Sequence, residues 1–304
     1  MTDRADYERQ VRLLVRVLPY VAEEKAFALK GGTAINLFLR DMPRLSVDID
    51  LTYLPIANRE QSLHDCRAAL QRIGQSLETS SPQIATAAQS ISRDQLRLLV
   101  SDGEARIKVE VSPVLRGTLH PPIFRDIHPR VADRFGFARV AVLDEPDLYG
   151  GKICAALDRQ HPRDWFDVML LLRENGFTRA TFEGFLVYLI SHNRSMADLL
   201  EPRLQDLSAA FENQFQGMTE QPVLLHDLVQ TRSDLLKSLS QLFTANDKSF
   251  LLSVKQGEPN WSLLPLPGVS ELPAVRWKLQ NIRAMSQLKH KQAVANFKDV
   301  LNRL

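Results

Sequence analysis

The sequence predicts an α+β protein, with a mixed sheet flanked by helices in residues 1–175 and a mainly helical domain in residues 176–304. Between residues 47 and 52, apolar and acidic or hydroxyl residues alternate, which is the period of a strand with one buried face. The same alternation recurs at residues 107–112. From Thr178 onward the apolar residues follow helical spacing instead.

The composition is that of an ordinary globular protein. The chain has 304 residues, enough for two domains, of which 44% are hydrophobic and 24% charged. A net charge of +2 neither favours nor excludes a nucleic-acid partner. Cys66 and Cys154 lack metal-ligand spacing, which fits a reduced compartment. We see no signal peptide and no membrane-spanning stretch, and therefore expect a cytoplasmic protein without a membrane partner.

The first elements lead to a glycine step. A helix is expected over residues 6–24, and a strand-like piece at residues 27–29 then meets a helix-like piece that begins near Ile35. Between them, at residues 30–33, stands the sequence KGGT. A Gly-Gly step lets the backbone approach a ligand closely, and the N–H groups at the start of a helix favour an anion. The alternative is an ordinary tight turn.

Asp48 and Asp50 are expected on one face of the next strand, roughly 7 Å apart, because they are two residues apart. Two such carboxylates repel each other unless a cation lies between them, and a hard divalent cation is the usual solution. Ser46 shares this face and could reach a phosphate, or be a solvated residue where the strand begins. An Asp-x-Asp on a strand is also common without metal, but together with the glycine step it indicates phosphoryl or nucleotidyl transfer.

The following elements contain a third candidate acid. A helix is expected over residues 55–77, a loop over residues 78–92 and a hairpin over residues 94–113, whose turn is Asp-Gly at 102–103. Glu110 lies between β-branched neighbours on the second strand of that hairpin. If this strand lies beside the first, three carboxylates converge; otherwise Glu110 is a solvent-facing strand residue.

Further along, residues 114–133 are rich in turn signals, and residues 137–143 form a last short strand. A helix then begins at Asp144 and ends near Gln160, and the next helix carries Asp164 and Asp167 three residues apart, hence as neighbours. Segment 150–167 is dense in charge. Its candidates for a polar site include Lys152, Arg159, Arg163, Asp164 and Asp167. A structural ion-pair network is the alternative.

The remainder is expected to be helical, apart from an irregular stretch at residues 246–272. The final helix, about residues 274–304, carries seven lysines and arginines against one acid. Such a helix is a candidate contact for a nucleic-acid backbone, or a solvated face.

Three segments together resemble a known family. The order LKGGTAINLFLRDMPRLSVDIDL, then KVEVSP, then LYGGKICAALDRQHPRDWFDVMLLL is similar to the AbiEii/AbiGii family of nucleotidyltransferase toxins, the MenT-like toxins. These are relatives of DNA polymerase β in their catalytic fold, and the resemblance covers roughly residues 25–175. It implies a polymerase-β-type nucleotidyltransferase domain, followed by a helical C-terminal domain that matches only in character.

The resemblance implies a role for each candidate residue. The nucleotide phosphates would be held by Gly31, Gly32 and Thr33, with support from Arg44 and Ser46. Asp48 and Asp50 would bind Mg²⁺, and Glu110 matches a third acid of the wider superfamily that this toxin group often lacks. Lys152 would neutralise phosphate charge, and Asp167 would orient the phosphate or act as base. Supporting positions would be Arg159, Arg163 and Asp164.

The implied activity is Mg²⁺-dependent transfer of a nucleoside monophosphate from an NTP, often a pyrimidine nucleotide, to RNA. The expected acceptor is the tRNA 3′ end, where addition would block translation. The protein would then be the toxin of a toxin–antitoxin or phage-defence (abortive infection) system, with an AbiEi-like or other antitoxin. The residues leave open a protein or small-molecule acceptor, a metal-dependent phosphohydrolase or nuclease, and a non-catalytic binding module with a vestigial site.

Overall fold

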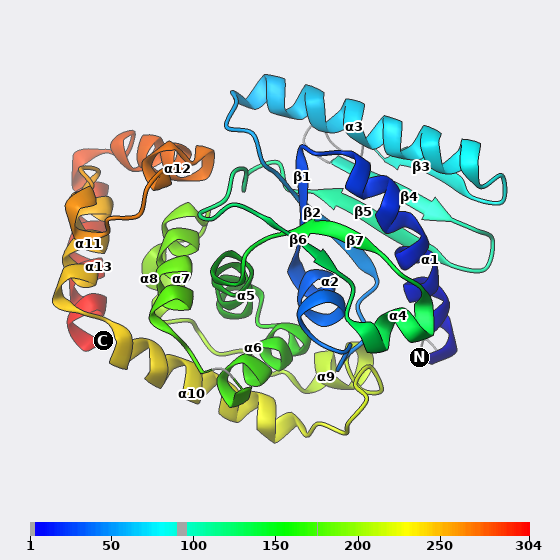
Figure 1. The fold of residues 1–304 in the computed structure, drawn as a ribbon. Coiled ribbons are helices and arrows are strands. Elements are labelled where there is room, and N and C mark those ends of the chain that lie inside the picture. The colour runs from blue at the N-terminus through cyan, green and yellow to red at the C-terminus, as the bar shows by residue number, and fades with distance from the viewer. Residues whose placement is uncertain (1–3, 90–95, 175) are drawn as a thin grey trace. The chain divides into compact units, whose positions relative to one another are not determined.

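The computed structural model describes residues 4–89, 96–174 and 176–304 (Figure 1). Two compact units make up the chain: unit 1 comprises residues 1–144 and 215–222, and unit 2 comprises residues 145–214 and 223–304. The predicted α+β fold class is confirmed. The domain boundary predicted at residue 175, which lies outside the described residues, stays a prediction.

Unit 1 is built on a mixed sheet, as expected. Along the sheet its described strands are β3 (Ala85–Gln89), β4 (Leu96–Ser101), β5 (Arg106–Val111), β2 (Asp48–Tyr53), β1 (Phe27–Lys30), β7 (Arg139–Val142) and β6 (Ile123–Asp126). The central strand β2 pairs antiparallel with β1 and parallel with β5, so its Ile49 and Leu51 are fully buried. The predicted hairpin is confirmed in β4 and β5, and only residues 94–95 of it lie outside the described part.

The helices of unit 1 are α1 (Arg4–Glu23), α2 (Gly31–Ala34), α3 (Arg59–Ser80) and α4 (Pro129–Phe135). Helices α1 and α3 contact each other and pack against the sheet (Figure 1), α1 on β5 and β7 and α3 on β3 and β4. Helix α2 continues as a π-helical turn, η1 (Ile35–Leu39), whose apolar residues are buried. Segment 215–222 returns to unit 1, where the Leu45 N–H donates to the Met218 carbonyl at 2.9 Å.

Two sequence-based expectations for unit 1 are wrong. The loop predicted at residues 78–92 contains the end of α3 and all of β3, although residues 90–92 lie outside the described part. Its small and polar residues suit β3 because that strand lies at the edge of the sheet and pairs with β4 alone. The turn-rich stretch at residues 114–133 likewise contains β6 and part of α4.

Unit 2 is helical. Its elements are α5 (Glu145–Arg159), α6 (Pro162–Glu174), α7 (Arg179–Ser191), α8 (Met196–Leu200), α9 (Ser208–Gln214), α10 (Leu225–Leu242), α11 (Ala245–Gln256), the short 3₁₀ turns η2 (Trp261–Leu263) and η3 (Val269–Glu271), α12 (Pro273–Arg283) and α13 (Gln287–Arg303). Helix α5 packs against α6, α7 and α8. The stretch predicted to be irregular contains α11, and the predicted final helix is two helices, α12 and α13.

Helices α5 and α7 approach each other through glycines. A Cβ atom at Gly150 would lie 2.5 Å from the backbone carbon of Gly184, and one at Gly184 would lie 2.1 Å from the Pro146 carbonyl oxygen. Backbone cannot yield as the tip of a side chain can. This helix pair therefore depends on the absence of side chains at both positions.

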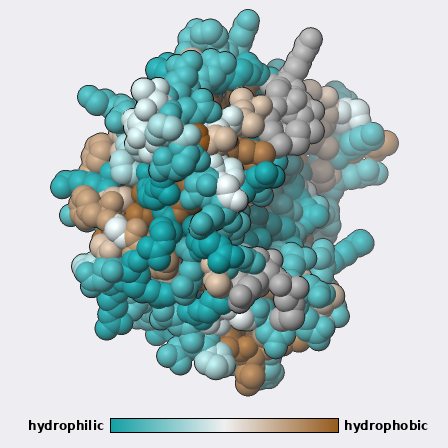
Figure 2. Space-filling model, turned by 90° about the vertical axis from the view of Figure 1, so that its right-hand side faces the viewer, coloured by the Kyte–Doolittle hydropathy of each residue, from teal (hydrophilic) through white to brown (hydrophobic). Residues whose placement is uncertain are grey.

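Figure 2 shows one face, on which hydrophilic side chains predominate and apolar ones are scattered. None of the helices in the described part is long and apolar enough to cross a membrane.

Gly150→Ala should lower the free energy of unfolding by about 2 kcal/mol or more, because the methyl group meets backbone on α7. This sign is diagnostic, since glycine to alanine within a helix is otherwise stabilising by up to about 1 kcal/mol. The measurement is urea unfolding followed by circular dichroism. Gly151→Ala is the matched control, because its Cβ would meet only the Tyr188 ring, at 3.1 Å. Equal effects of the two substitutions would contradict the proposed packing.

Candidate active site

Four charged residues form a row across the centre of the unit 1 sheet. In the strand register, Lys30 of β1 lies opposite Asp50 of β2, Asp50 opposite Glu110 of β5, and Glu110 opposite Arg97 of β4. All four side chains therefore project from the same face, in the order plus, minus, minus, plus. The convergence of Glu110 with the aspartates, which the sequence left open, follows from the parallel pairing of β2 and β5.

Each acid of the site has a cation nearby. Arg97 forms an ion pair with Glu110 through its Nε atom, and Lys108 Nζ lies 3.8 Å from Asp48 Oδ1. Burial lowers the pKa of Lys30, while the negative charge of Asp50 acts in the opposite direction. These cations partly offset the repulsion between neighbouring acids.

The predicted glycine step lies directly against side chains of the site. Gly31 has a φ of +74°, and a Cβ there would lie 2.7 Å from Asp50 Oδ2. At Gly32 a Cβ would lie 2.5 Å from the Arg44 guanidinium and 3.0 Å from Ser46 Oγ. The glycines therefore let the side chains of the site pack onto the backbone of residues 31–32. The sequence predicted close approach by a ligand, whereas the structure shows close approach by Asp50, Arg44 and Ser46.

Thr33 and Ser46 join the glycine step to the strand that carries the acids. The two hydroxyl oxygens are 3.0 Å apart, and Thr33 Oγ1 also donates to the Asp48 carbonyl at 2.5 Å. Arg44 is buried and donates to the Leu45 carbonyl at 2.9 Å. The structure thus gathers eight of the predicted residues in unit 1: Gly31, Gly32, Thr33, Arg44, Ser46, Asp48, Asp50 and Glu110.

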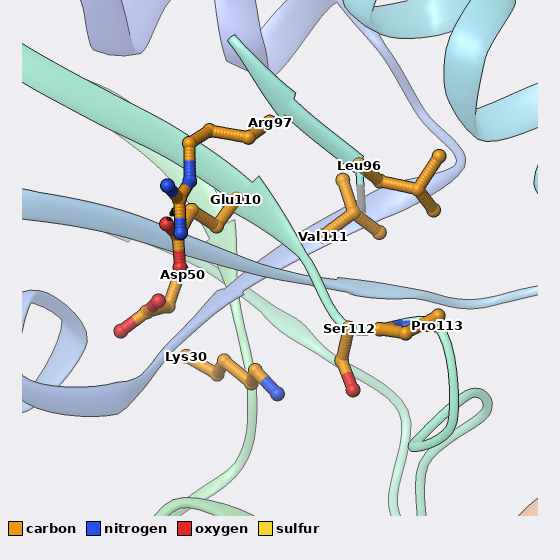
Figure 3. Close-up of a pocket in the computed structure, with 8 residues that line it drawn as sticks. All are labelled: Lys30, Asp50, Leu96, Arg97, Glu110, Val111, Ser112 and Pro113. Atoms are coloured by element: carbon orange, nitrogen blue, oxygen red, sulfur yellow. Dashed lines mark ion pairs between the residues drawn. The ribbon is translucent and has the colours of Figure 1, made fainter. Parts of the chain in front are cut away.

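A pocket of about 330 Å³ opens beside this row. Figure 3 shows Asp50, Glu110 and Arg97 together at one side, with the Lys30 side chain extending toward Ser112 at the other. Leu96, Val111 and Pro113 complete the lining. Polar groups and an apolar wall in one cavity suit a ligand with both charged and apolar parts, as a nucleotide has.

The residues present fit a magnesium ion. Mg²⁺ prefers oxygen ligands and commonly binds one or two carboxylates together with substrate phosphates. Asp48 and Asp50 supply two such carboxylates on one face, and the Asp48 side chain is 38% exposed. Within the described residues, no group of three or more His, Cys, Asp or Glu side chains is arranged to hold a metal. A two-carboxylate site is consistent with both observations, and the metal role predicted for Glu110 stays a prediction.

The second set of predicted residues lies in unit 2, where α5 and α6 form a buried ion cluster. Lys152 Nζ lies 2.8 Å from Asp164 Oδ1 and 2.9 Å from Asp167 Oδ2, and all three side chains are at most 4% exposed. Arg159, which is 64% exposed, binds both oxygens of Asp164. Burial alone would raise the pKa of Asp164, but Lys152 and Arg159 outweigh it and hold that pKa well below its usual value.

The sequence left two interpretations of this cluster open, a polar site for the reaction and a structural ion-pair network. The network that the sequence offered as the structural alternative is present, since one buried lysine is shared by two buried carboxylates. Arg163, which was predicted to support the site, is half-buried, and its backbone N–H donates to His161 Nδ1 at 3.1 Å. The predicted roles of Lys152 and Asp167 in the reaction stay predictions.

Sequence reasoning missed Lys30, Arg97 and Lys108. Arg97 and Lys108 belong to the predicted hairpin, and Lys30 directly follows the strand-like piece predicted at residues 27–29. Their approach to the acids depends on which strands are neighbours and in which register, and neither is written in the local pattern.

Comparison with known proteins identifies the family. The profile described as "Nucleotidyl transferase AbiEii toxin, Type IV TA system" matches residues 12–281. Among solved structures the protein is similar to MenT4, a nucleotidyltransferase toxin from Mycobacterium tuberculosis H37Rv, with a TM-score of 0.60, 12% identity and coverage of 96% of this chain and 94% of that chain. At that identity the likeness shows a shared fold.

Comparison with curated proteins gives no significant match. The family profile nonetheless spans most of both units, including the glycine step, the three acids and the buried cluster. The chain therefore belongs to the AbiEii family of nucleotidyltransferase toxins from type IV toxin–antitoxin systems.

Proposed function

We propose that this toxin transfers a nucleoside monophosphate from an NTP to RNA, with the reaction centred on Asp48 and Asp50. The observation that carries the proposal is the packing of Asp50 against the backbone of Gly31, with Arg44 and Ser46 against Gly32. A carboxylate pair for a cation and an adjacent polar turn are what a triphosphate needs. A metal-dependent nuclease would require the acids but not this turn.

In this proposal, different residues of unit 1 bind the metal and the phosphates. Asp48 and Asp50 would hold Mg²⁺, which when bound supplies a Lewis acid that offsets the charge of the triphosphate. Ser46, Thr33 and Arg44 lie at the glycine step, where hydroxyl and guanidinium donors can bind phosphate oxygens. In the reaction an acceptor hydroxyl attacks the α-phosphorus, a new O–P bond forms, and the bond to the β-phosphate breaks to release pyrophosphate. Holding both partners in line is the main contribution of these residues.

The proposed acceptor is the 3′ end of tRNA, and the proposed donor is a pyrimidine NTP. Both come from the family resemblance. In cells, blocked aminoacylation would stop translation, and the antitoxin of the type IV system would counter it. We place this reaction in the cytoplasm, where the toxin would serve an abortive-infection response.

The basic C-terminal helices lend this acceptor less support than their sequence suggested. Arg276 pairs with Glu271 and Arg303 with Glu201, while Lys278 Nζ donates to the carbonyls of His192 and Arg194 at 2.6 and 2.5 Å. These three cations therefore already have partners within unit 2. A protein or small-molecule hydroxyl therefore stays open as the alternative acceptor.

We also propose that Lys152 neutralises phosphate charge during the reaction and that Asp167 orients the phosphate. Lys152 bridges the two acids, and a buried lysine held between carboxylates is fixed in place. A purely structural role predicts a different result, namely loss of stability without a separate loss of chemistry.

Asp48→Asn and Asp50→Asn should each lower transfer of labelled α-phosphate from NTP by at least about 100-fold, because each removes a ligand charge from the proposed cation site. The measurement supplies each of the four NTPs with Mg²⁺, and offers total tRNA and total protein as acceptors. The control is Asp126→Asn, which alters an exposed strand carboxylate paired with Arg139.

Label on tRNA that is lost only in the two site variants would support the proposal and name the donor. Label on protein would keep the enzyme class and change the acceptor. Full activity of Asp48→Asn would contradict the proposed site.

Lys152→Met should lower the free energy of unfolding at about pH 7.5 by about 3–5 kcal/mol, because it leaves two buried carboxylates without their shared cation. In the wild type the pKa of Asp164 is depressed, so the stability it contributes is present above its unfolded pKa and is lost as pH falls through the folded pKa. Without Lys152, burial is opposed by fewer cations and the pKa of Asp164 rises relative to the wild type, so the variant loses less stability as pH falls. The difference from wild type should therefore shrink toward about pH 5.

Urea unfolding at the two pH values measures this, with Arg159→Met as the control. Arg159 is largely exposed and its loss leaves Asp164 paired with Lys152, so this substitution should cost clearly less than Lys152→Met. A constant difference between Lys152→Met and wild type at both pH values would contradict the buried cluster. Transfer by the folded fraction of Lys152→Met, if at least about tenfold below Arg159→Met, would support a role in the reaction as well.

A further inference from the structure

The charged row raises the question of how many carboxylates the cation site uses. Neighbouring strands are about 4.8 Å apart, whereas alternate residues of one strand are about 7 Å apart. In register, Glu110 is therefore as well placed beside Asp50 as Asp48 is. Position alone would predict a site with three carboxylates.

The partners of the acids differ in kind. Glu110 forms a direct ion pair with the Nε atom of Arg97, although these two atoms do not meet hydrogen-bond geometry, and the two side chains are 33% and 26% exposed. Asp48 faces Lys108 Nζ at 3.8 Å, with both side chains more exposed, at 38% and 46%. Arg97 and Glu110 are in direct contact, whereas Lys108 stands farther from Asp48, and a lysine ammonium on its flexible stem moves away easily. Asp48 is therefore readily available to a cation, and Glu110 is not.

The close-up view shows the surroundings of Glu110. Figure 3 shows Arg97 reaching over β5 to Glu110 on the side of the pocket where Asp50 lies, while Lys30 extends toward Ser112. The guanidinium thus lies where a cation bound by Asp50 and Glu110 together would compete with it for the glutamate. The Arg97 guanidinium therefore already supplies the positive charge that a metal ion bound to Glu110 would supply.

We propose that Arg97 is a positioning residue that holds Glu110 away from the cation, so that Asp48 and Asp50 alone bind it. The inference rests on the proposed function for the presence of a cation at the two aspartates. It extends that proposal by making Arg97 the residue that fixes the carboxylate count. Removing Arg97 should then create a third ligand and a tighter site.

The test measures Mn²⁺ binding to the protein without nucleotide, from the electron paramagnetic resonance signal of free Mn²⁺. Arg97→Met should bind Mn²⁺ roughly tenfold more tightly than wild type, the scale typical of changes in residues around metal ligands. The bound Mn²⁺ should also lose one water ligand, counted from ¹⁷O-water coupling. Arg97→Lys should keep an affinity near that of wild type, because it preserves a cation beside Glu110.

Two further variants separate ligation from net charge. Arg97→Met/Glu110→Gln should return to the wild-type affinity and water count, and Arg106→Met, which removes an exposed cation from the same strand as Glu110, should change neither. An unchanged affinity in Arg97→Met would overturn the inference, as would a gain that survives in the double variant.

A single substitution provides an independent check that does not depend on removing the arginine. Glu110→Gln alone should leave Mn²⁺ affinity within about threefold of wild type, since Glu110 is not a ligand while Arg97 is present. A large loss would overturn the inference. If instead Asp48→Asn leaves Mn²⁺ binding intact, the failure lies with the proposed cation site itself, so the two failures are distinguishable.

Discussion

The parallel pairing of β2 with β5 is the interaction on which the candidate site depends. It places Asp50 beside Glu110 and Asp48 beside Lys108. A shift of one residue in this register would turn the acids toward the buried face and expose Ile49 and Val109, both fully buried. The apolar core thus fixes the positions of the charges.

The polar face of the same strands is arranged to limit the repulsion that this register creates. Acids of like charge at the same level of neighbouring strands oppose each other, and here the outer strands supply cations at both ends of the row. An arginine contacts one acid directly, while a lysine stands at a longer distance from another. The acids therefore differ in their availability although their strand settings are alike.

Much of this site was predictable from local pattern. The alternation around Asp48 and Asp50, and around Glu110, identified the strands and the exposed faces. The hairpin turn of residues 102–103 showed that β4 and β5 are partners. Strand order was not predictable, because the pairing of β2 with β5 joins segments far apart in the chain. Which lysines and arginines lie beside the acids depends on that strand order.

The same distinction holds in unit 2. Spacing predicted that Asp164 and Asp167 are neighbours on α6, and the structure bears this out by placing both against one lysine. That the lysine is Lys152 of α5 depends on how two helices pack. Burial distinguishes this cluster from a solvated network, and the degree of burial cannot be judged from the composition of a charge-rich segment.

The central claim is that the acids of β2 and the backbone of residues 31–32 form one nucleotide site. A crystal structure with Mn²⁺ and an NTP analogue that cannot release pyrophosphate would test it most directly. The account predicts an anomalous peak within ligand distance of both Asp48 and Asp50, with triphosphate density beside Gly31 and Gly32. Metal bound at other residues, or phosphates held away from the glycine step, would contradict it.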